Sequence, residues 1–370
     1  MINTYIPYIS KSERKLLNSC LNSTFISTAG PRIEQFENLF SKIFKFKYAV
    51  AVNSGTSALH LALLTSGIKK DDIVITPSYT FAATANAITY TGATPWFIDC
   101  DKSLILDISK VDKILKEKTI KKSNHLIDKS SGKIIRAILP VQTFGKSIEF
   151  LEYVKLAKKY NLKIIFDSAA SHDPKIFNFK KSPNSIFCFS FNGNKTITTG
   201  AGGILATNSK KLASIARIYS TVGKKKSNYD YQKIGYNYKM TNIQASMGIS
   251  QLKKLRKIIN KKKLIFKYYN LNIKENSKYL KIYDKKFVNW VFVLELKNSK
   301  IFKLLKKKFD LNKIQANFFW KPLHLQTPYK NFKKSNLSYS NKIWKKIFVL
   351  PSHPGITKRD QKKICKILNF

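Results

Sequence analysis

Short apolar runs alternate with amphipathic segments along the first 210 residues of the chain. The apolar runs predict buried strands, and they lie at residues 49–52, 73–77, 96–99, 134–141, 163–166, 186–189 and 203–207. The segments 55–66, 82–91 and 147–160 between them predict helices. Repeated strand–helix–strand units are typical of a largely parallel sheet with helices on both faces.

The pattern changes outside these units. Residues 101–124 predict a long, basic, helical excursion, and residues 242 to about 268 predict another long helix. Strands at 290–296 and 313–319 around a helix at 299–309 indicate a small α+β cap. A chain of 370 residues suits two domains. We expect a large α/β domain over residues 1–240 and a small α+β C-terminal domain over residues 241–370.

The carboxyl ends of the predicted strands are where an α/β sheet binds its ligands. At one such end, Asn53-Ser54-Gly55-Thr56-Ser57 turns a strand into a helix, and a helix start exposes unpaired N–H groups that can hold an anion. The stretch lacks the GxxxxGK of a nucleotide P-loop, so a small phosphate ester suits it better. Strand–turn–helix junctions are common, and a purely structural turn is the alternative.

A lysine and a carboxylate follow two other predicted strands. Lys195 lies in a polar loop of small residues after strand 186–189, where a held amine can have a lowered pKa and attack a carbonyl. A surface turn is the alternative reading. Asp167 ends strand 163–166, 28 positions earlier (195 − 167), where it could pair with a protonated pyridine nitrogen or simply cap a helix.

These motifs resemble those of the DegT/DnrJ/EryC1/StrS sugar aminotransferases, which use pyridoxal phosphate (PLP). Their order and spacing match from about Ser27 to Pro351, and the Ser-Phe-Asn-Gly-Asn-Lys form that ends at Lys195 is specific to that family. The resemblance also covers Gly-Tyr-Asn-Tyr-Lys-Met, which ends at Met240, and the Trp320-Lys321-Pro322-Leu323-His324 stretch. It implies the PLP-dependent transferase fold type I, as in aspartate aminotransferase.

The resemblance implies a role for each matched residue. Lys195 and Asp167 are the expected catalytic residues, with Lys195 carrying PLP and Asp167 holding its ring nitrogen. The expected cofactor-binding residues are Gly55, Thr56, Ser57, Phe81, Asp167, Ser190, Lys195 and Asn237. An aromatic ring such as Phe81 can stack on a pyridine ring, although a core position is its alternative. The candidate substrate residues are His172, Trp320 and His324.

The resemblance further implies partners and a reaction. Asn237 matches a family residue that reaches the phosphate of a neighbouring subunit, so we expect a homodimer with shared active sites. Glutamate is the expected amino donor. The expected acceptor is a nucleotide-linked keto sugar, with a 4-keto-6-deoxy sugar favoured, and the amino sugar would serve polysaccharide or glycan biosynthesis.

Three positions depart from the family pattern. Ala170 lacks the polar side chain usual three residues after the aspartate, Lys239 stands where arginine is usual, and Asn317 replaces another arginine. His172 could substitute for the missing group at Ala170, or it could be a local structural histidine. These changes support an alternative, a PLP-fold homologue without transaminase activity, such as a regulator. A PLP-dependent sugar dehydratase is disfavoured, because that branch replaces the lysine with histidine.

The formal net charge of +47 raises the possibility of nucleic-acid binding. Only six of the 68 basic residues are arginine, the preferred reader of phosphates and base edges, and the lysines are spread along the chain. We therefore expect no specific nucleic-acid partner and keep a basic nucleic-acid-binding protein as the weaker alternative. Long-range attraction of an anionic substrate is the favoured interpretation of the charge.

The remaining features point to a cytoplasmic protein. The four cysteines, Cys20, Cys100, Cys188 and Cys365, have neither metal-ligand nor CxxC spacing, which favours free thiols in a reducing compartment and no metal site. No run of 18 apolar residues predicts a membrane span. Residues 1–10 lack the basic-then-apolar composition of a signal peptide.

Overall fold

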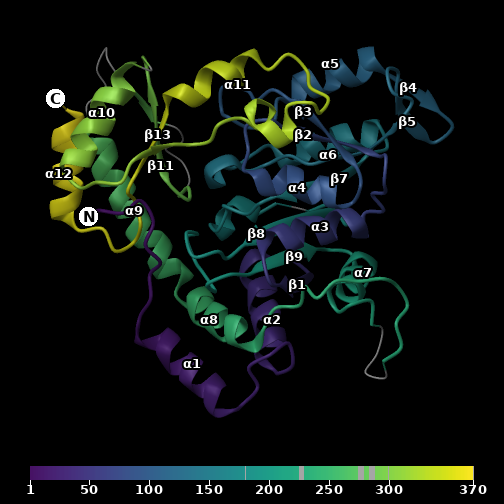
Figure 1. Cartoon of the computed structure of the whole chain (residues 1–370). Helices are drawn as coiled ribbons and strands as arrows, with labels where there is room; N and C mark the ends of the chain where they lie inside the picture. The colour runs from purple at the N-terminus through teal and green to yellow at the C-terminus, as the bar shows by residue number, and fades with distance from the viewer. Residues whose placement is uncertain (180, 225–228, 274–278, 283–287, 299, 370) are drawn as a thin grey trace.

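The computed structural model describes residues 1–179, 181–224, 229–273, 279–282, 288–298 and 300–369. Two sheets organise these residues (Figure 1). The larger sheet is built from the first 210 residues, and the smaller one from the C-terminal part of the chain. None of the helices described has the length and apolar character of a membrane span.

The main path of the larger sheet runs β1-β9-β8-β7-β6-β2-β3. Its strands are β1 (Tyr48–Val52), β2 (Ile73–Pro77), β3 (Thr94–Ile98), β6 (Ile134–Ile138), β7 (Lys163–Asp167), β8 (Ser185–Ser190) and β9 (Gly203–Thr207). The central strands β8, β7, β6, β2 and β3 pair in parallel, as the repeated units predict. β9 pairs antiparallel with both β8 and β1, because a loop joins β8 to β9 without a crossover helix.

Helices cover both faces of this sheet. They are α2 (Arg32–Phe44), α3 (Gly55–Thr65), α4 (Ala82–Tyr90), α5 (Ile108–Lys118), α6 (Phe150–Lys159) and α7 (Lys210–Ser220). Alternate residues of β8 divide between two cores: Phe187 and Phe189 join a phenylalanine-rich core with α2 and α6, and Cys188 joins a core with α3 and α7. The period of two places a buried face on each side of the strand.

The predicted helical excursion at 101–124 is wrong in extent. Asp107 caps α5 by accepting a hydrogen bond from the Lys110 N–H, so the helix begins only at Ile108. After Lys118 the chain forms a hairpin of β4 (Thr119–Lys122) and β5 (His125–Asp128), and β5 pairs antiparallel with β6. The segment therefore extends the sheet at its edge.

The long helix expected from residue 242 is divided at Lys254 into α8 (Asn242–Lys253) and α9 (Leu255–Asn272). α8 packs against α2 and against the N-terminal helix α1 (Lys11–Asn22), and its buried apolar side chains Ala245, Ile249 and Leu252 belong to the phenylalanine-rich core. The C-terminal core begins within α9, at Ile265. The division at residues 240 and 241 stays a prediction.

The smaller sheet has the antiparallel order β10-β11-β13-β12. Its strands are β10 (Tyr279–Ile282), β11 (Phe292–Leu296), β12 (Asn317–Phe318) and β13 (Ile347–Leu350), and the helices nearby are α10 (Lys300–Leu311), α11 (Ser338–Ile343) and α12 (Lys358–Leu368). This agrees with the expected α+β cap, with a shorter strand at 317–318. The predicted helix start at residue 299 lies outside the described residues.

Short 3₁₀ turns connect several of these elements. They are η1 (Thr143–Gly145), η2 (Pro174–Phe177), η3 (Leu323–Leu325), η4 (Thr327–Tyr329) and η5 (Trp344–Lys346).

Two glycines allow close packing of the strand ends beneath the start of α3. A Cβ atom on Gly203 would lie 2.4 Å from the Ser54 carbonyl oxygen, and one on Gly55 would lie 2.6 Å from the Ser190 Cβ. These separations are too short for any side chain. The absence of a side chain at both positions thus brings the β8 end, the β9 start and the α3 turn together.

We predict that Gly203→Ala lowers the free energy of unfolding by about 1–3 kcal/mol, because the added Cβ atom would force the backbone carbonyl of Ser54 to move. Urea unfolding followed by circular dichroism measures the change. Gly355→Ala is the control, since its added Cβ would find its nearest neighbour, the His353 side chain, at 3.5 Å. Equal stability of the two variants would contradict the packing argument.

Candidate active site

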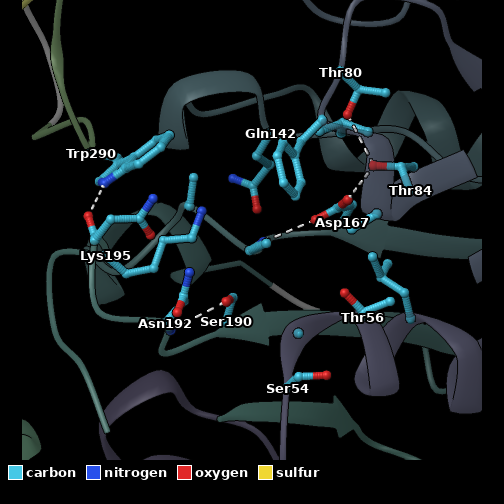
Figure 2. A pocket seen from close by; sticks show the side chains of 18 of the residues that line it. Ser54, Thr56, Thr80, Thr84, Gln142, Asp167, Ser190, Asn192, Lys195 and Trp290 are labelled. Carbon is cyan, nitrogen blue, oxygen red and sulfur yellow. Dashed lines mark hydrogen bonds between the residues drawn. The ribbon is translucent and has the colours of Figure 1, made fainter. Parts of the chain in front are cut away.

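A cavity of about 390 Å³ lies at the carboxyl ends of the central parallel strands. Residues from both parts of the chain line it: Ser54, Gly55, Thr56, Thr80, Phe81, Thr84, Gln142, Asp167, Ala170, Ser190, Lys195, Trp290, Phe319 and Trp320 are among them. Its volume is in the range of small-ligand sites. Figure 2 shows Lys195 close to Trp290, and Asp167 beside Thr84.

Lys195 lies in the loop between β8 and β9. The Lys195 N–H donates to the Asn192 carbonyl at 2.9 Å, which closes a tight turn, and the Thr198 hydroxyl donates to the Phe191 carbonyl at 2.9 Å. The Lys195 Nζ lies 4.1 Å from the centre of the Trp290 ring. Burial lowers the pKa of Lys195 to about 8, although the Asp167 carboxylate acts in the opposite direction. The amine is thus closer to its nucleophilic, neutral form than an ordinary lysine.

Asp167 is the last residue of β7 and is 5% exposed. Its Oδ2 accepts a hydrogen bond from the Thr84 hydroxyl at 2.8 Å, and its Oδ1 accepts one from the Ala169 N–H at 3.1 Å. The Thr84 hydroxyl has a single proton, which it donates to Asp167. The Thr80 hydroxyl, whose oxygen lies 3.0 Å from that of Thr84, is therefore the donor in the bond between the two threonines. Burial raises the pKa of Asp167, whereas these donors and Lys195 act to lower it.

The start of α3 forms another wall of the cavity. The Ser54 hydroxyl caps the helix by accepting from the Ser57 N–H at 3.0 Å. Within the described residues the N–H groups of Gly55 and Thr56 donate no hydrogen bond, which leaves them for an anion at the positive end of the helix dipole. The Ser57 hydroxyl instead donates to the Asn53 side chain at 2.6 Å, so Ser57 supports the turn and is not a cavity-lining residue.

Aromatic side chains line the cavity from two directions. Phe81 is the residue before α4 and is 58% exposed, so it is no core residue. Its ring lies 6.1 Å from that of Trp320, which also stacks on Phe144 at 5.3 Å. Phe81 and Trp320 therefore present flat apolar surface to the cavity. The stacking of Phe81 on a pyridine ring and the contact of Trp320 with substrate stay predictions. Ser190 lines the cavity at the end of β8, where its Oγ accepts from the Asn192 N–H at 3.4 Å.

The two histidines predicted for the substrate do not belong to the cavity-lining residues. The Nε2 of His172 contacts the Ser190 carbonyl at 2.9 Å, and its burial lowers the pKa of the ring to about 3. His324 lies between the Ser78 hydroxyl, at 2.5 Å, and the Asn341 side chain, at 2.7 Å. In this chain both rings support the loops behind the cavity.

Asn237 is exposed and is not a cavity-lining residue of its own chain. Its carbonyl accepts a hydrogen bond from the Asn53 side chain at 3.2 Å, which ties its segment to the α3 turn. Lys239 pairs its backbone with Val52 and donates its N–H to the Ser220 carbonyl at 3.0 Å. Asn237 is thus exposed beside the α3 turn.

The sequence analysis missed several cavity residues, and three of them bear on the chemistry of the site. Thr84 follows Phe81 by one helical turn, so a search for hydroxyls on that face of α4 would have found it. Gln142 follows the predicted strand 134–141; its Nε2 donates to the Lys146 carbonyl, and its buried Oε1 has no partner among the described residues. Trp290 is 95 positions from Lys195 (290 − 195), and no sequence signal joins them.

The departures from the family pattern have different surroundings. Ala170 lines the cavity and is 7% exposed, so the position of the missing polar group does face the site. Gln142 is the polar side chain that the same cavity offers nearby. The backbone of Asn317 pairs with Val349, and its side chain lies outside the description.

Comparison with known proteins identifies the family of this chain. The profile of the DegT/DnrJ/EryC1/StrS aminotransferase family matches residues 7–369. The chain is 33% identical to a GDP-perosamine synthase of Escherichia coli O157:H7, with 100% of this chain and 98% of that protein covered. A crystal structure of a DegT DnrJ EryC1 StrS aminotransferase from Brucella abortus is 26% identical over 97% of this chain and 94% of its own, with a TM-score of 0.86.

A putative sugar aminotransferase from Streptococcus pneumoniae, solved in its PLP form, has the same fold at 21% identity, with a TM-score of 0.85 over 99% of this chain and 97% of its own. The predicted α/β fold class and the predicted enzyme class are both confirmed by these comparisons. The chain belongs to the DegT/DnrJ/EryC1/StrS aminotransferase family.

Proposed function

We propose that this protein is a PLP-dependent aminotransferase that converts a nucleotide-linked keto sugar to an amino sugar. The observation that carries the proposal is that Lys195 and Asp167 line one cavity together with the N-terminus of α3, at Gly55 and Thr56. These three groups match the aldehyde, the ring nitrogen and the phosphate of the cofactor. PLP is a cofactor that uses this combination of an amine, a buried carboxylate and an anion site.

The residues present fit PLP on physical grounds. The N–H groups of Gly55 and Thr56 supply donors for a phosphate, and the glycine lets Ser190 pack against the turn. Phe81 supplies an aromatic face for the pyridine ring. Asp167 keeps free lone pairs, because each of its oxygens accepts one hydrogen bond from the chain.

PLP, when bound, supplies an electron sink that allows an amino group and a proton to leave one carbon and join another. Lys195 is the group of this chain that accepts and returns that proton, because its lowered pKa suits a base near neutral pH. Asp167 would hold the positive charge of the ring nitrogen, and the Thr84 hydroxyl, which donates to its Oδ2, would orient the carboxylate. Trp290 covers the amine and limits its contact with water.

The substrate class follows from the family and from charge. The E. coli relative is a GDP-perosamine synthase, and a relative from Campylobacter jejuni, 34% identical over 75% of this chain and 72% of its own length, is a UDP-linked sugar transaminase. A net charge of +47 attracts a nucleoside diphosphate sugar by long-range electrostatics. A 4-keto-6-deoxy sugar as acceptor and glutamate as donor remain the favoured pair, for polysaccharide or glycan synthesis.

We further infer a homodimer with shared sites in a cytoplasmic enzyme. Asn237 is exposed next to the α3 turn, at the position from which the family's asparagine reaches a neighbouring phosphate. Ile234, at 92% exposed, and Tyr231, at 53%, lie in the same segment, and such apolar exposure suits a subunit contact. Neither a nucleic acid nor a membrane is needed for this function.

We predict that PLP is attached to Lys195. The purified protein should absorb visible light, and borohydride should fix the cofactor to the peptide that contains Lys195. Because burial lowers the pKa of Lys195 to about 8, the rate of PLP capture by cofactor-free protein should rise about tenfold per pH unit and level off above pH 8. Attachment to any other lysine, or a rise that continues to pH 10, would sink this assignment.

We predict that Asp167→Asn retains bound PLP and slows the half-reaction with glutamate by about 10²-fold or more, because a neutral amide no longer holds the ring nitrogen protonated. Stopped-flow absorbance measures the rate. Asp173→Asn is the matched control, since Asp173 is buried too but accepts the Lys175 N–H in η2. A normal rate in the Asp167 variant would contradict the role.

We predict that mixing inactive Lys195→Ala chains with inactive Asn237→Asp chains restores activity. One hybrid site would combine a native Lys195 with a native Asn237 from the other chain. The added carboxylate places a negative charge beside a phosphate, so Asn237→Asp should block binding more firmly than removal of the side chain. Subunit exchange without recovered activity, or an active monomer by light scattering, would refute the shared site.

A further inference from the structure

Lys262 is an unusual lysine in this lysine-rich chain. It lies in α9, is 2% exposed, and takes part in no ion pair among the described residues. A buried amine without a carboxylate is costly unless its N–H groups are satisfied. Its position, in the helix that joins the two cores, therefore calls for a specific set of acceptors.

Two backbone carbonyls are those acceptors. The Nζ of Lys262 donates to the Trp290 oxygen at 2.9 Å and to the Ser352 oxygen at 3.0 Å. Burial lowers the pKa of Lys262 to about 7, yet a neutral amine still has two N–H groups, so both bonds persist without the charge. Lys262 thus joins the chain before β11 to the chain after β13 in either protonation state.

Trp290 is held from its other sides as well. Its N–H donates to the Phe144 carbonyl at 2.9 Å, and its indole Nε1 donates to the Asn194 carbonyl at 2.6 Å. Tyr5 stacks on the indole with a centroid distance of 5.2 Å. The indole is therefore bonded to the residue that immediately precedes Lys195, and the same ring lies 4.1 Å from the Lys195 Nζ.

We propose that Lys262 is a positioning residue that acts through Trp290 to set the place of the Lys195 amine. The bond to the Trp290 carbonyl holds the backbone, the backbone holds the indole, and the indole holds both the loop at Asn194 and the amine. This series of contacts from Lys262 to Lys195 rests on the distances in the structure. Its importance for catalysis rests on the proposed function.

The first experiment observes Trp290 without any cofactor. The chain has four tryptophans, so an indole ¹H–¹⁵N spectrum contains few signals, and Trp290→Phe identifies the one required. In Lys262→Met, which keeps the length but removes the donors, hydrogen exchange of the Trp290 indole should accelerate at least tenfold. Lys262→Gln, which retains a donor on a shorter side chain, gives an intermediate change and serves if the methionine variant does not fold.

Lys181→Met is the matched control. Lys181 is also buried, at 7% exposed, donates to the Phe177 carbonyl at 2.6 Å, and lies over the rings of Phe46 and Phe179, all away from the cavity. Its loss should lower stability without changing the exchange of the Trp290 indole. Unchanged exchange in both Lys262 variants, or equal acceleration in Lys181→Met, would overturn the proposal.

The second experiment is a double-mutant cycle on the rate at which cofactor-free protein captures added PLP, followed by visible absorbance. Lys262→Met should slow capture at least fivefold in the native background and less than twofold in the Trp290→Phe background, because its effect passes through the indole. Equal slowing in both backgrounds would refute the route through Trp290. If no variant and no native protein captures PLP, the proposed function fails, whereas the indole exchange still decides the role of Lys262.

Discussion

Desolvation of the Lys195 amine is the constraint on which the rest of the site depends. An amine surrounded by protein loses part of its preference for the charged form, and its pKa falls to about 8. The opposing field of Asp167 prevents a larger fall. Burial raises the pKa of Asp167 in turn, and the hydrogen bonds from Thr84 and the Ala169 N–H favour its charged form. Across the shared cavity Asp167 therefore raises the pKa of Lys195, and Lys195 lowers the pKa of Asp167.

The sheet topology brings these groups together. Parallel strands end at one edge, so β7 delivers Asp167 and β8 delivers Ser190 to the same side of the molecule. The reversal from β8 to β9 places the Lys195 loop directly above this edge. Glycines at 55 and 203 allow the α3 turn to approach closely enough to complete the third wall. A change in any one of these backbone contacts would alter the cavity as a whole.

The C-terminal part of the chain contributes the cover of the site. Trp290 precedes β11, and Trp320 follows β12, so both rings project from the smaller sheet toward the carboxyl ends of the larger one. The hydrogen bonds of Trp290 to Phe144 and Asn194 fasten this cover to the large sheet. Lys262 is one of the few lysines buried among the described residues, and it donates to the Trp290 backbone carbonyl.

The sequence by itself determined the strand and helix pattern of the α/β part, the lysine loop, the strand-end Asp167 and the helix start at Gly55. These features are local, because hydrophobic periodicity, glycine turns and motif spacing are read within a few residues. Local signals were weaker where partners are distant. The hairpin at 119–128 exists because β6 offers it an edge, and the long C-terminal helix divides at Lys254 where two cores meet.

Only the tertiary structure decided which polar side chains face the cavity. Ser57, His172 and His324 sit in the right motifs, yet hydrogen bonds to Asn53, Ser190 and Ser78 turn them toward the supporting loops. Thr84 could be inferred from its place one helical turn after Phe81, whereas no motif indicates Gln142 or Trp290. All three line the cavity because separate elements meet there. The contact of Lys195 with Trp290 joins positions 95 residues apart (290 − 195), and such a contact arises from packing, which no local pattern encodes.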